Sequence, residues 1–269
     1  MKQPKFVSGP PGTGKTHKFL VEEYIKLLKN YDPEKIIMLS HTNVAADELK
    51  EAVLELPEIK EKRGLKKKFF KYKICTIHSF CKSKLLKKEL ITYADYLNLC
   101  AENSGFKAQR VTQSEFNDDK HKFFKFLGDA FGQGRTIKEH WNSLKETSSN
   151  YYPYNNFRMI YEMKEVYDNY KKVNQVCDYN DMVKDFIDHA VVPDIDVLIV
   201  DEAQDSNVPQ IKALEKMSTN VKEYYMVGDA DQTIFEFAGA NADYFHKLSK
   251  DAEQLDEGLR CGKTINTLC

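Results

Sequence analysis

A glycine-rich segment near the start of the chain carries the residue types that bind nucleotide phosphates. It reads GPPGTGKT from Gly9 to Thr16 and fits the pattern GxxxxGKS/T between an expected strand and an expected helix. The glycines let backbone N–H groups turn toward phosphate oxygens, and the helix N-terminus favours negative charge. Lys15 would reach the β- and γ-phosphates, and the Thr16 hydroxyl would coordinate Mg²⁺. We therefore expect ATP with Mg²⁺ here, bound through Gly9, Pro10, Pro11, Gly12, Thr13, Gly14, Lys15 and Thr16.

Two carboxylates, Asp201 and Glu202, directly follow the unbroken apolar run VLIV from Val197 to Val200. Such a run indicates a strand that is buried on both faces, as in a parallel sheet, where its carboxyl end shares an edge with the phosphate loop. Asp201 could bind Mg²⁺ directly or through water, and Glu202 could act as general base toward the attacking water. An isolated Asp-Glu pair is usually part of an ordinary loop, so this interpretation depends on the phosphate loop.

A third group of polar residues follows a further expected strand, from Tyr224 to Val227. The sequence VGDADQT, from Val227 to Thr233, places the neutral amide of Gln232 shortly beyond that strand. An amide in this place could hydrogen-bond both the γ-phosphate and the attacking water, and so report hydrolysis to its neighbours.

These groups come together only if the strands that precede them belong to one sheet. Short apolar β-type runs alternate with helical patterns, including a helix around His17 to Lys29, which is typical of a mostly parallel α/β sheet. Ligands of such sheets lie at the carboxyl ends of the strands. The expected strands are Lys5 to Ser8, Ile36 to Ser40, Tyr72 to Ile77, Val197 to Val200 and Tyr224 to Val227.

The stretch from about Lys82 to Val176 has a different character. It is aromatic, rich in lysine and mostly helical in pattern, with turn signals at Ser104-Gly105 and Tyr152-Pro153. We interpret it as an insertion that forms a second, helical subdomain within the sheet domain.

Composition and charge exclude some classes of protein and leave others open. With 42% hydrophobic and 30% charged residues, the chain has the composition of an ordinary globular protein. No apolar run approaches the roughly 18 residues of a membrane span, and the six scattered cysteines suit a reducing compartment. We therefore expect a cytoplasmic protein with no membrane partner. The net charge is only −1, but twelve Lys or Arg lie between Lys60 and Lys88. That segment could bind a polyanion or be a solvated face.

The order of these motifs resembles that of superfamily 1 DNA helicases of the UvrD/Rep type. The resemblance runs in family order over nearly the whole chain. GPPGTGKT (9–16) resembles motif I, LSHTNVAADEL (39–49) motif Ia, CTIHSFC (75–81) motif Ib, DYNDM (178–182) the acidic element before motif II, VDEAQD (200–205) motif II, VGDADQTIFEFAGA (227–240) motif III, and LDEGLRCGKTI (255–265) the start of motif IV.

The resemblance implies a fold, a division into domains and a set of roles. The fold would be a RecA-like P-loop NTPase domain, called 1A, over residues 1–81 and 177–257, with an inserted helical subdomain, 1B, over 82–176. Residues 258–269 would begin a second RecA-like domain. Lys15, Glu202, Gln232 and Arg260 would be catalytic, and Thr16 and Asp201 would hold Mg²⁺. Single-stranded nucleic acid, DNA rather than RNA, would contact His41, Thr42, Asn43, Thr76, His78, Ser79 and Phe237.

Several positions depart from the family pattern. His41 stands where the family often has a stacking phenylalanine, so its ring either stacks on a base or is a surface histidine. Phe237 is expected to stack on a base, worth about 1–3 kcal/mol, or to be a core aromatic. Only eight residues precede Gly9, and Gln3 is too close to it to act as the family's adenine-binding glutamine. The resemblance therefore leaves the choice of nucleotide base open.

The function implied is that of the ATP- and DNA-binding core of a UvrD-like helicase. ATP hydrolysis would drive translocation on single-stranded DNA and unwinding once a second RecA-like domain or chain completes the cleft, because the sequence ends nine residues beyond Arg260. The alternative is an ATP-switched module that binds DNA or a partner without unwinding.

Overall fold

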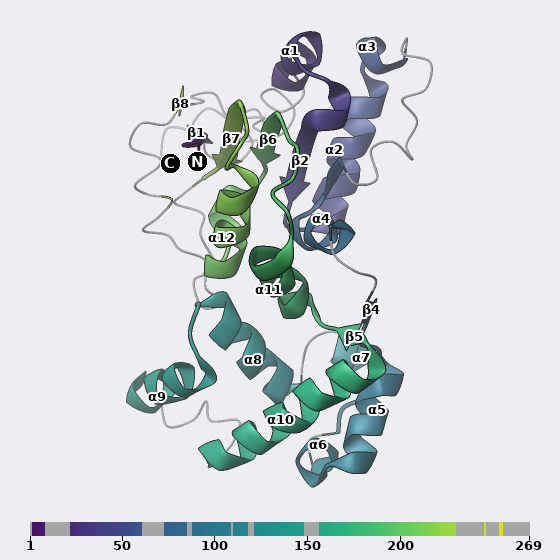
Figure 1. Cartoon of the computed structure of the whole chain (residues 1–269), viewed down its shortest axis with the longest axis vertical. Helices are drawn as coiled ribbons and strands as arrows, with labels where there is room; N and C mark the ends of the chain where they lie inside the picture. The colour runs from purple at the N-terminus through teal and green to yellow at the C-terminus, as the bar shows by residue number, and fades with distance from the viewer. Residues whose placement is uncertain are drawn as a thin grey trace, which may run out of the picture.

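A parallel β-sheet forms the centre of the computed structural model, which describes residues 2–8, 22–60, 73–84, 88–108, 110–117, 121–147, 156–229, 245 and 253–254. Within these residues, six strands pair in the order β3-β2-β6-β7-β1-β8 (Figure 1), and every pairing in this sheet is parallel. The predicted parallel α/β fold is therefore confirmed. The strands are β1 (Lys5–Ser8), β2 (Ile36–Ser40), β3 (Ile74–Thr76), β6 (Val197–Val200), β7 (Glu223–Gly228) and β8 (Glu253–Gln254).

The strands that precede the polar motifs occur where the sequence predicted them. β1, β2 and β6 have the predicted bounds, and β7 is one residue longer at each end. β3 ends one residue earlier than predicted because Thr76 already caps helix α4 (Ile77–Ser83), and the predicted first residue, Tyr72, lies outside the described residues. The helix predicted around residues 17–29 is described from Glu22 onward, as α1 (Glu22–Asn30).

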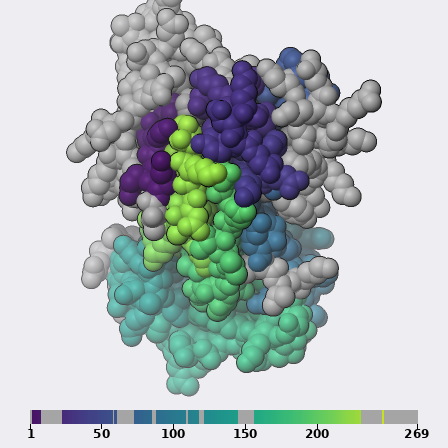
Figure 2. Space-filling model, turned by 45° about the horizontal axis from the view of Figure 1, so that its top comes forward, coloured from purple at the N-terminus to yellow at the C-terminus, as the bar shows by residue number. Residues whose placement is uncertain are grey.

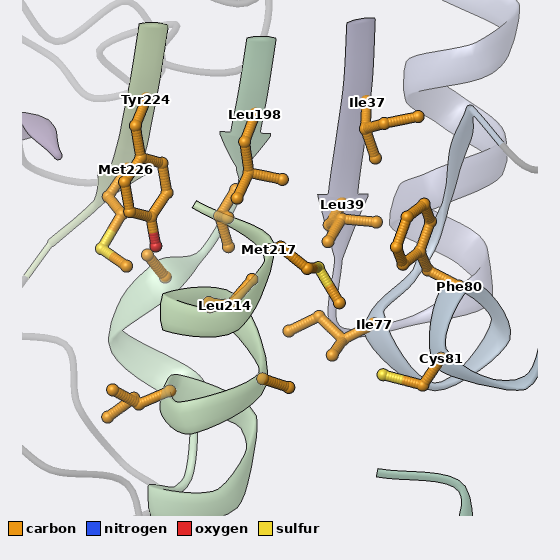
Figure 3. Close-up of a cluster of buried hydrophobic side chains, with 14 of the residues drawn as sticks. Ile37, Leu39, Ile77, Phe80, Cys81, Leu198, Leu214, Met217, Tyr224 and Met226 are labelled. Carbon is orange, nitrogen blue, oxygen red and sulfur yellow. The ribbon is translucent and has the colours of Figure 1, made fainter. Parts of the chain in front are cut away.

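Alternate residues of the strands enter two separate hydrophobic cores, one on each face of the sheet. On β6, Val197 and Ile199 belong to one core, whereas Leu198 and Val200 belong to the other. Both faces are therefore buried, which explains why β6 is an unbroken apolar run rather than an alternating one. Figure 3 shows the second core, in which Leu39, Leu198 and Met226 point from the sheet toward the helices below.

Helices cover both faces. The core that contains Val197 is closed by α1, α2 (Asn43–Glu55) and α3 (Pro57–Lys60). The opposite core is closed by α4, α11 (Tyr179–His189) and α12 (Val208–Met217). Two short 3-10 turns, η2 (Pro33–Lys35) and η4 (Ala203–Asp205), lead into β2 and out of β6. Figure 2 shows the region of β7, in yellow-green, between the purple N-terminal strand and the blue-violet segment that contains α1.

A helical unit with its own core extends from one end of the sheet unit (Figure 1). Its core is built from aromatic and aliphatic side chains, among them Phe106, Phe123, Trp141, Ile160 and Met163. The segments that enter and leave this unit lie next to each other, because β4 (Glu89–Leu90) pairs in parallel with β5 (Val176–Cys177). Its helices are α5 (Tyr93–Glu102), α6 (Ser104–Ala108), α7 (Gln113–Asn117), α8 (Lys122–Gly132), α9 (Ile137–Thr147) and α10 (Phe157–Asn174).

None of the helices in the described part of the chain is long and apolar enough to cross a membrane.

Candidate nucleotide and nucleic-acid site

The parallel register brings the carboxyl ends of the strands to one edge of the sheet. Ser8, the last residue of β1, is paired with Gly228 of β7, and Val200 of β6 is paired with Met226. Only β7 separates β1 from β6, so their ends are roughly 10 Å apart, two strand spacings. The predicted phosphate-binding residues Gly9 to Thr16, Lys15 among them, lie outside the described residues, as do Gln232, Phe237 and Arg260. The described residues therefore locate the end of β1, Ser8, which directly precedes the glycine-rich segment.

Asp201 and Glu202 lie at this same edge. Asp201 is 3% exposed, and its backbone N–H donates to the carbonyl oxygen of Leu39 at 2.8 Å, which continues the β2–β6 pairing by one residue. Glu202 is partly buried and has a left-handed backbone, with φ 49° and ψ 43°. Such a conformation costs a residue with a side chain about 1–2 kcal/mol. It turns the chain sharply out of β6 and into η4, so that the Glu202 carboxylate stays at the sheet edge.

Further carboxyl groups make this edge strongly acidic. Asp205 lies at the end of η4, and Asp229 is the first residue beyond β7 and is 8% exposed. Burial, together with the negative charge of Glu202, raises the pKa of Asp205 to about 6. One oxygen of Asp205, Oδ1, is buried without a hydrogen-bond partner. The edge therefore favours a cation.

The acidic edge fits a magnesium ion that shares its ligands with a nucleotide. No group of three or more His, Cys, Asp or Glu in the described part of the chain is arranged to hold a metal alone. Mg²⁺ in nucleotide sites is typically held by one or two carboxylates together with phosphates and water. Asp201 suits that role because it is buried at the end of β6, which only β7 separates from β1, the strand that leads to the glycine-rich segment.

Gln204 belongs to this site, although the sequence analysis placed it within the motif II segment without assigning it a role. Its side chain is 4% exposed. The Nε2 of Gln204 donates to Glu202 Oε2 at 2.8 Å, and its Oε1 accepts from the backbone N–H of Asp229 at 3.1 Å. Only the folded chain shows these contacts, since residues 204 and 229 are 25 positions apart.

The residues predicted to contact nucleic acid lie at the neighbouring strand ends. Ser40 of β2 is paired with Thr76 of β3, so the segments that begin at His41 and Ile77 lie side by side. Thr42 caps α2 by accepting from the N–H of Ala45 at 3.1 Å. Thr76 caps α4 by accepting from the N–H of Ser79 at 3.1 Å. Both threonines therefore fix the start of a helix at the sheet edge.

Exposure differs among these residues. Thr42, Asn43 and Ser79 are exposed, whereas Thr76 is 7% exposed and its hydroxyl donates to Ser79 Oγ at 2.9 Å. A ligand at this surface would therefore meet Thr42, Asn43 and Ser79 directly, and Thr76 would act mainly through the helix that it caps.

Burial lowers the pKa of both histidines of this surface. Burial, and to a smaller extent the proximity of His78, lowers the pKa of His41 to about 4. Burial also lowers the pKa of His78. The Nε2 of His41 is 3.0 Å from the hydroxyl oxygen of Ser206, the residue that follows η4. The His78 ring meets the Tyr179 ring edge-on, with centroids 5.5 Å apart, and Tyr179 is 59% exposed. Of these rings, the exposed ring of Tyr179 offers a stacking surface, whereas burial favours the uncharged form of the two histidines.

A partly buried ion cluster holds Tyr179 in place. Asp178 caps α11, and it accepts from the Tyr167 hydroxyl at 2.9 Å and from Lys171 Nζ at 2.8 Å. Lys171 is also 2.8 Å from Asp181. Burial opposes the charge of Lys171, but the two carboxylates outweigh it and raise the pKa of Lys171 to about 12. Helix α10 of the helical unit is thereby joined to the first turn of α11.

Comparison with known proteins points to one family. The model of the UvrD/REP helicase N-terminal domain matches residues 1–253. The ATP-dependent DNA helicase Rep of Buchnera aphidicola subsp. Baizongia pistaciae is 25% identical over 93% of this chain and 38% of the relative. A probable DNA helicase II homolog of Mycoplasma capricolum is 27% identical over 89% and 34%. The ATP-dependent DNA helicase PcrA of Staphylococcus aureus is 24% identical over 97% and 37%. The chain therefore spans between a third and two fifths of the length of these relatives.

Proposed function

The chain belongs to the UvrD/REP helicase N-terminal domain family, and from this membership we propose that it is the ATP- and DNA-binding core of an ATP-dependent DNA helicase. The resemblance predicted from the motifs is thus confirmed at the level of the family. One structural observation carries the proposal for this chain. The buried Asp201 and the neighbouring Glu202 leave the sheet at the edge where β1 delivers the glycine-rich segment.

The roles that we assign at the nucleotide site follow from this arrangement. Mg²⁺·ATP supplies the phosphoryl group and the charge that polarises it. The segment from Gly9 to Thr16 binds the phosphates, with Lys15 against the β- and γ-phosphates and Thr16 and Asp201 toward the metal. Glu202 accepts a proton from the attacking water. Gln232 and Arg260 would contact the γ-phosphate from motifs III and IV.

We assign single-stranded DNA to the surface beyond β2 and β3. The exposed groups of Thr42, Asn43 and Ser79 offer hydrogen bonds to the strand, and the exposed ring of Tyr179 offers a stacking surface beside His78. Because burial lowers the pKa of His41 and His78, we expect hydrogen bonding rather than ionic attraction from them. Phe237 would add a further ring from motif III. Stacking of a base on one such ring is worth about 1–3 kcal/mol.

We propose that the chain consists of one domain with an inserted subdomain and the start of a second domain. Residues 1–81 and 177–257 form domain 1A, residues 82–176 form subdomain 1B, and residues 258–269 begin a second RecA-like domain. The pairing of β4 with β5, and a separate core drawn from residues 91–176, support an inserted subdomain that ends near residue 176, whereas the proposed start at residue 82 lies within α4, ahead of β4. We place the protein in the cytoplasm, and we expect a second RecA-like domain to complete the cleft in which ATP is hydrolysed.

An assay of ATP turnover with and without single-stranded DNA tests the proposed function. We expect the 269-residue chain to bind both ligands and to hydrolyse ATP weakly, because an arginine supplied from the far side of the cleft can be worth roughly 10³–10⁵ in rate. DNA-stimulated turnover should appear when a second RecA-like domain is supplied. Vigorous duplex unwinding by the 269 residues alone would contradict this account. ATP and DNA binding with no stimulation in the completed protein would favour the ATP-switched binding module.

A further inference from the structure

One buried amide, that of Gln204, connects the ends of two neighbouring strands. Gln204 lies in η4, just beyond β6, whereas Asp229 is the first residue beyond β7. The amide bonds Glu202 Oε2 at 2.8 Å on one side and the backbone N–H of Asp229 at 3.1 Å on the other. The carboxylate proposed to activate water is therefore joined to the segment that leads to Gln232.

The orientation of this amide is fixed by its partners. A backbone N–H can only donate, so the group that faces Asp229 must be the carbonyl oxygen of Gln204. The NH₂ group must then face Glu202, whose ionised carboxylate can only accept. Turning the amide over would place two donors together on one side and two acceptors together on the other. The bond to Asp229 therefore fixes the orientation in which the Gln204 NH₂ group donates to Glu202, and the bond to Glu202 fixes the same orientation.

Gly228 leaves the space that the amide occupies. A Cβ built at Gly228 would be 2.2 Å from Gln204 Oε1, and 3.3 Å from both Gln204 Cδ and the backbone nitrogen of Ala203, so the amide oxygen is by far the closest atom. Among the described residues, Gly134 is the one glycine with a positive φ, so the backbone of Gly228 would accept alanine. The reason for glycine at position 228 is therefore the close approach of the Gln204 amide rather than backbone conformation.

The uncharged N–H donor of Gln204 suits the Glu202 carboxylate better than a cation would. It lies beside a second carboxyl group, that of Asp205, and the two negative charges repel each other. The backbone of Glu202 is held in the left-handed region, so small changes in η4 would redirect its side chain. A cation such as lysine would hold the carboxylate but would also neutralise it. An amide N–H holds Glu202 Oε2 and leaves the charge available to attract a proton.

We propose that Gln204 is a positioning residue, which holds the Glu202 carboxylate for water activation and links it to the motif III segment through the N–H of Asp229. This role rests on the proposed function of Glu202 as general base. It predicts that Gln204 affects the rate of ATP hydrolysis much more than the binding of ATP.

Turnover of [γ-³²P]ATP by the full 269-residue chain tests the proposal. In Gln204→Leu, we expect kcat to fall about 10- to 100-fold, the usual effect of losing one hydrogen bond to a charged group. KM should change by less than about threefold, because substrate binding in the ground state does not use the lost bond. Gly228→Ala should lower kcat in the same way by displacing the amide. Gly128→Ala is the matched control, since a Cβ at Gly128 meets no atom within 4 Å.

The pH dependence of a second variant separates positioning from a purely structural role. Gln204→Glu keeps an acceptor for the N–H of Asp229, but its carboxyl donates to Glu202 only when it is protonated. The kcat of this variant relative to the wild type should therefore rise as the pH is lowered from 8 to 6. A ratio that stays constant with pH, or a Gln204→Leu variant with wild-type kcat, would overturn the proposal.

Glu202→Gln distinguishes failure of this proposal from failure of the proposed function. If Glu202→Gln hydrolyses ATP as fast as the wild type, Glu202 is not the base and the proposed function fails. If Glu202→Gln is inactive but Gln204→Leu is fully active, only the positioning role fails.

An NMR measurement that does not depend on ATP hydrolysis tests the same link in variants whose turnover is too slow to measure. In ¹⁵N-labelled full chain, Glu202→Gln should shift the amide resonance of Asp229, and the Gln204→Leu background should abolish that shift. An Asp229 resonance that does not respond to Glu202→Gln would overturn the link.

Discussion

Replacing Asp205 by asparagine should stabilise the protein at neutral pH. Asp205 is partly buried beside Glu202, and one of its oxygens has no hydrogen-bond partner. Burial and the Glu202 charge raise its pKa from 3.8 to about 6. A carboxyl group with a raised pKa contributes stability that is fully present below pH 3.8 and is lost as the pH rises through 6. At neutral pH the ionised Asp205 is therefore a cost that asparagine, which has almost the same shape, does not carry.

The size of this effect follows from the shift in pKa. One pKa unit corresponds to about 1.36 kcal/mol, so the full shift is worth about 3 kcal/mol in the free energy of unfolding at pH 8. The same relation leaves only about 0.5 kcal/mol at pH 4. Because Asp205 is only half-buried, we expect a measured gain of about 1–3 kcal/mol at pH 8.

Urea unfolding of the wild type and of Asp205→Asn at pH 8, 6 and 4 measures this difference directly. All other groups titrate alike in the two proteins, so their contributions cancel. The advantage of the variant should shrink steadily as the pH falls. A variant that is less stable than the wild type at pH 8, or a difference that does not change with pH, would refute the account of the acidic edge.

Three further predictions follow from other contacts. Both His121 ring nitrogens are buried without partners, and burial lowers the pKa of His121 to about 4. Between pH 7.5 and 5, His121→Phe should therefore lose about 2 kcal/mol less free energy of unfolding than the wild type. Urea unfolding in which both proteins lose the same free energy over this range would contradict this. Lys171→Met should cost about 3–5 kcal/mol by leaving Asp178 and Asp181 unpaired, and an unchanged melting temperature would argue against it. Glu202→Gln should leave Mg²⁺·ATP affinity within about threefold and stop turnover, as measured by nucleotide binding and phosphate release, and a large loss of affinity would contradict its role as base.

The strands of the sheet could be predicted because short runs of neighbouring apolar residues in the sequence indicate them. Alternate residues of β6 enter opposite cores, so every residue is apolar and the run VLIV indicates a strand buried on both faces. The polar residues at its end then share an edge with those that follow β1, since parallel strands end together. The positions of Asp201 and Glu202 therefore followed from sequence alone.

The contacts around those residues depend on distances that no sequence pattern contains. The bond between Gln204 and Asp229 spans two strands, and the ring contact between His78 and Tyr179 joins two helices. The sequence also gave no sign that Thr76 is buried as a helix cap rather than exposed to a ligand. The left-handed backbone of Glu202 was equally hidden, because glutamate rarely adopts it.

Binding of Mg²⁺·ATP to the full chain, compared with binding to Lys15→Ala, shows whether the glycine-rich segment is the ATP site. A fluorescent ATP analogue titrated in the presence and absence of Mg²⁺ gives the affinity of each protein. We expect Mg²⁺-dependent binding by the wild type and loss of binding in Lys15→Ala, because Lys15 would contact the β- and γ-phosphates. Equal affinity in the two proteins would contradict the assignment of the glycine-rich segment as the ATP site.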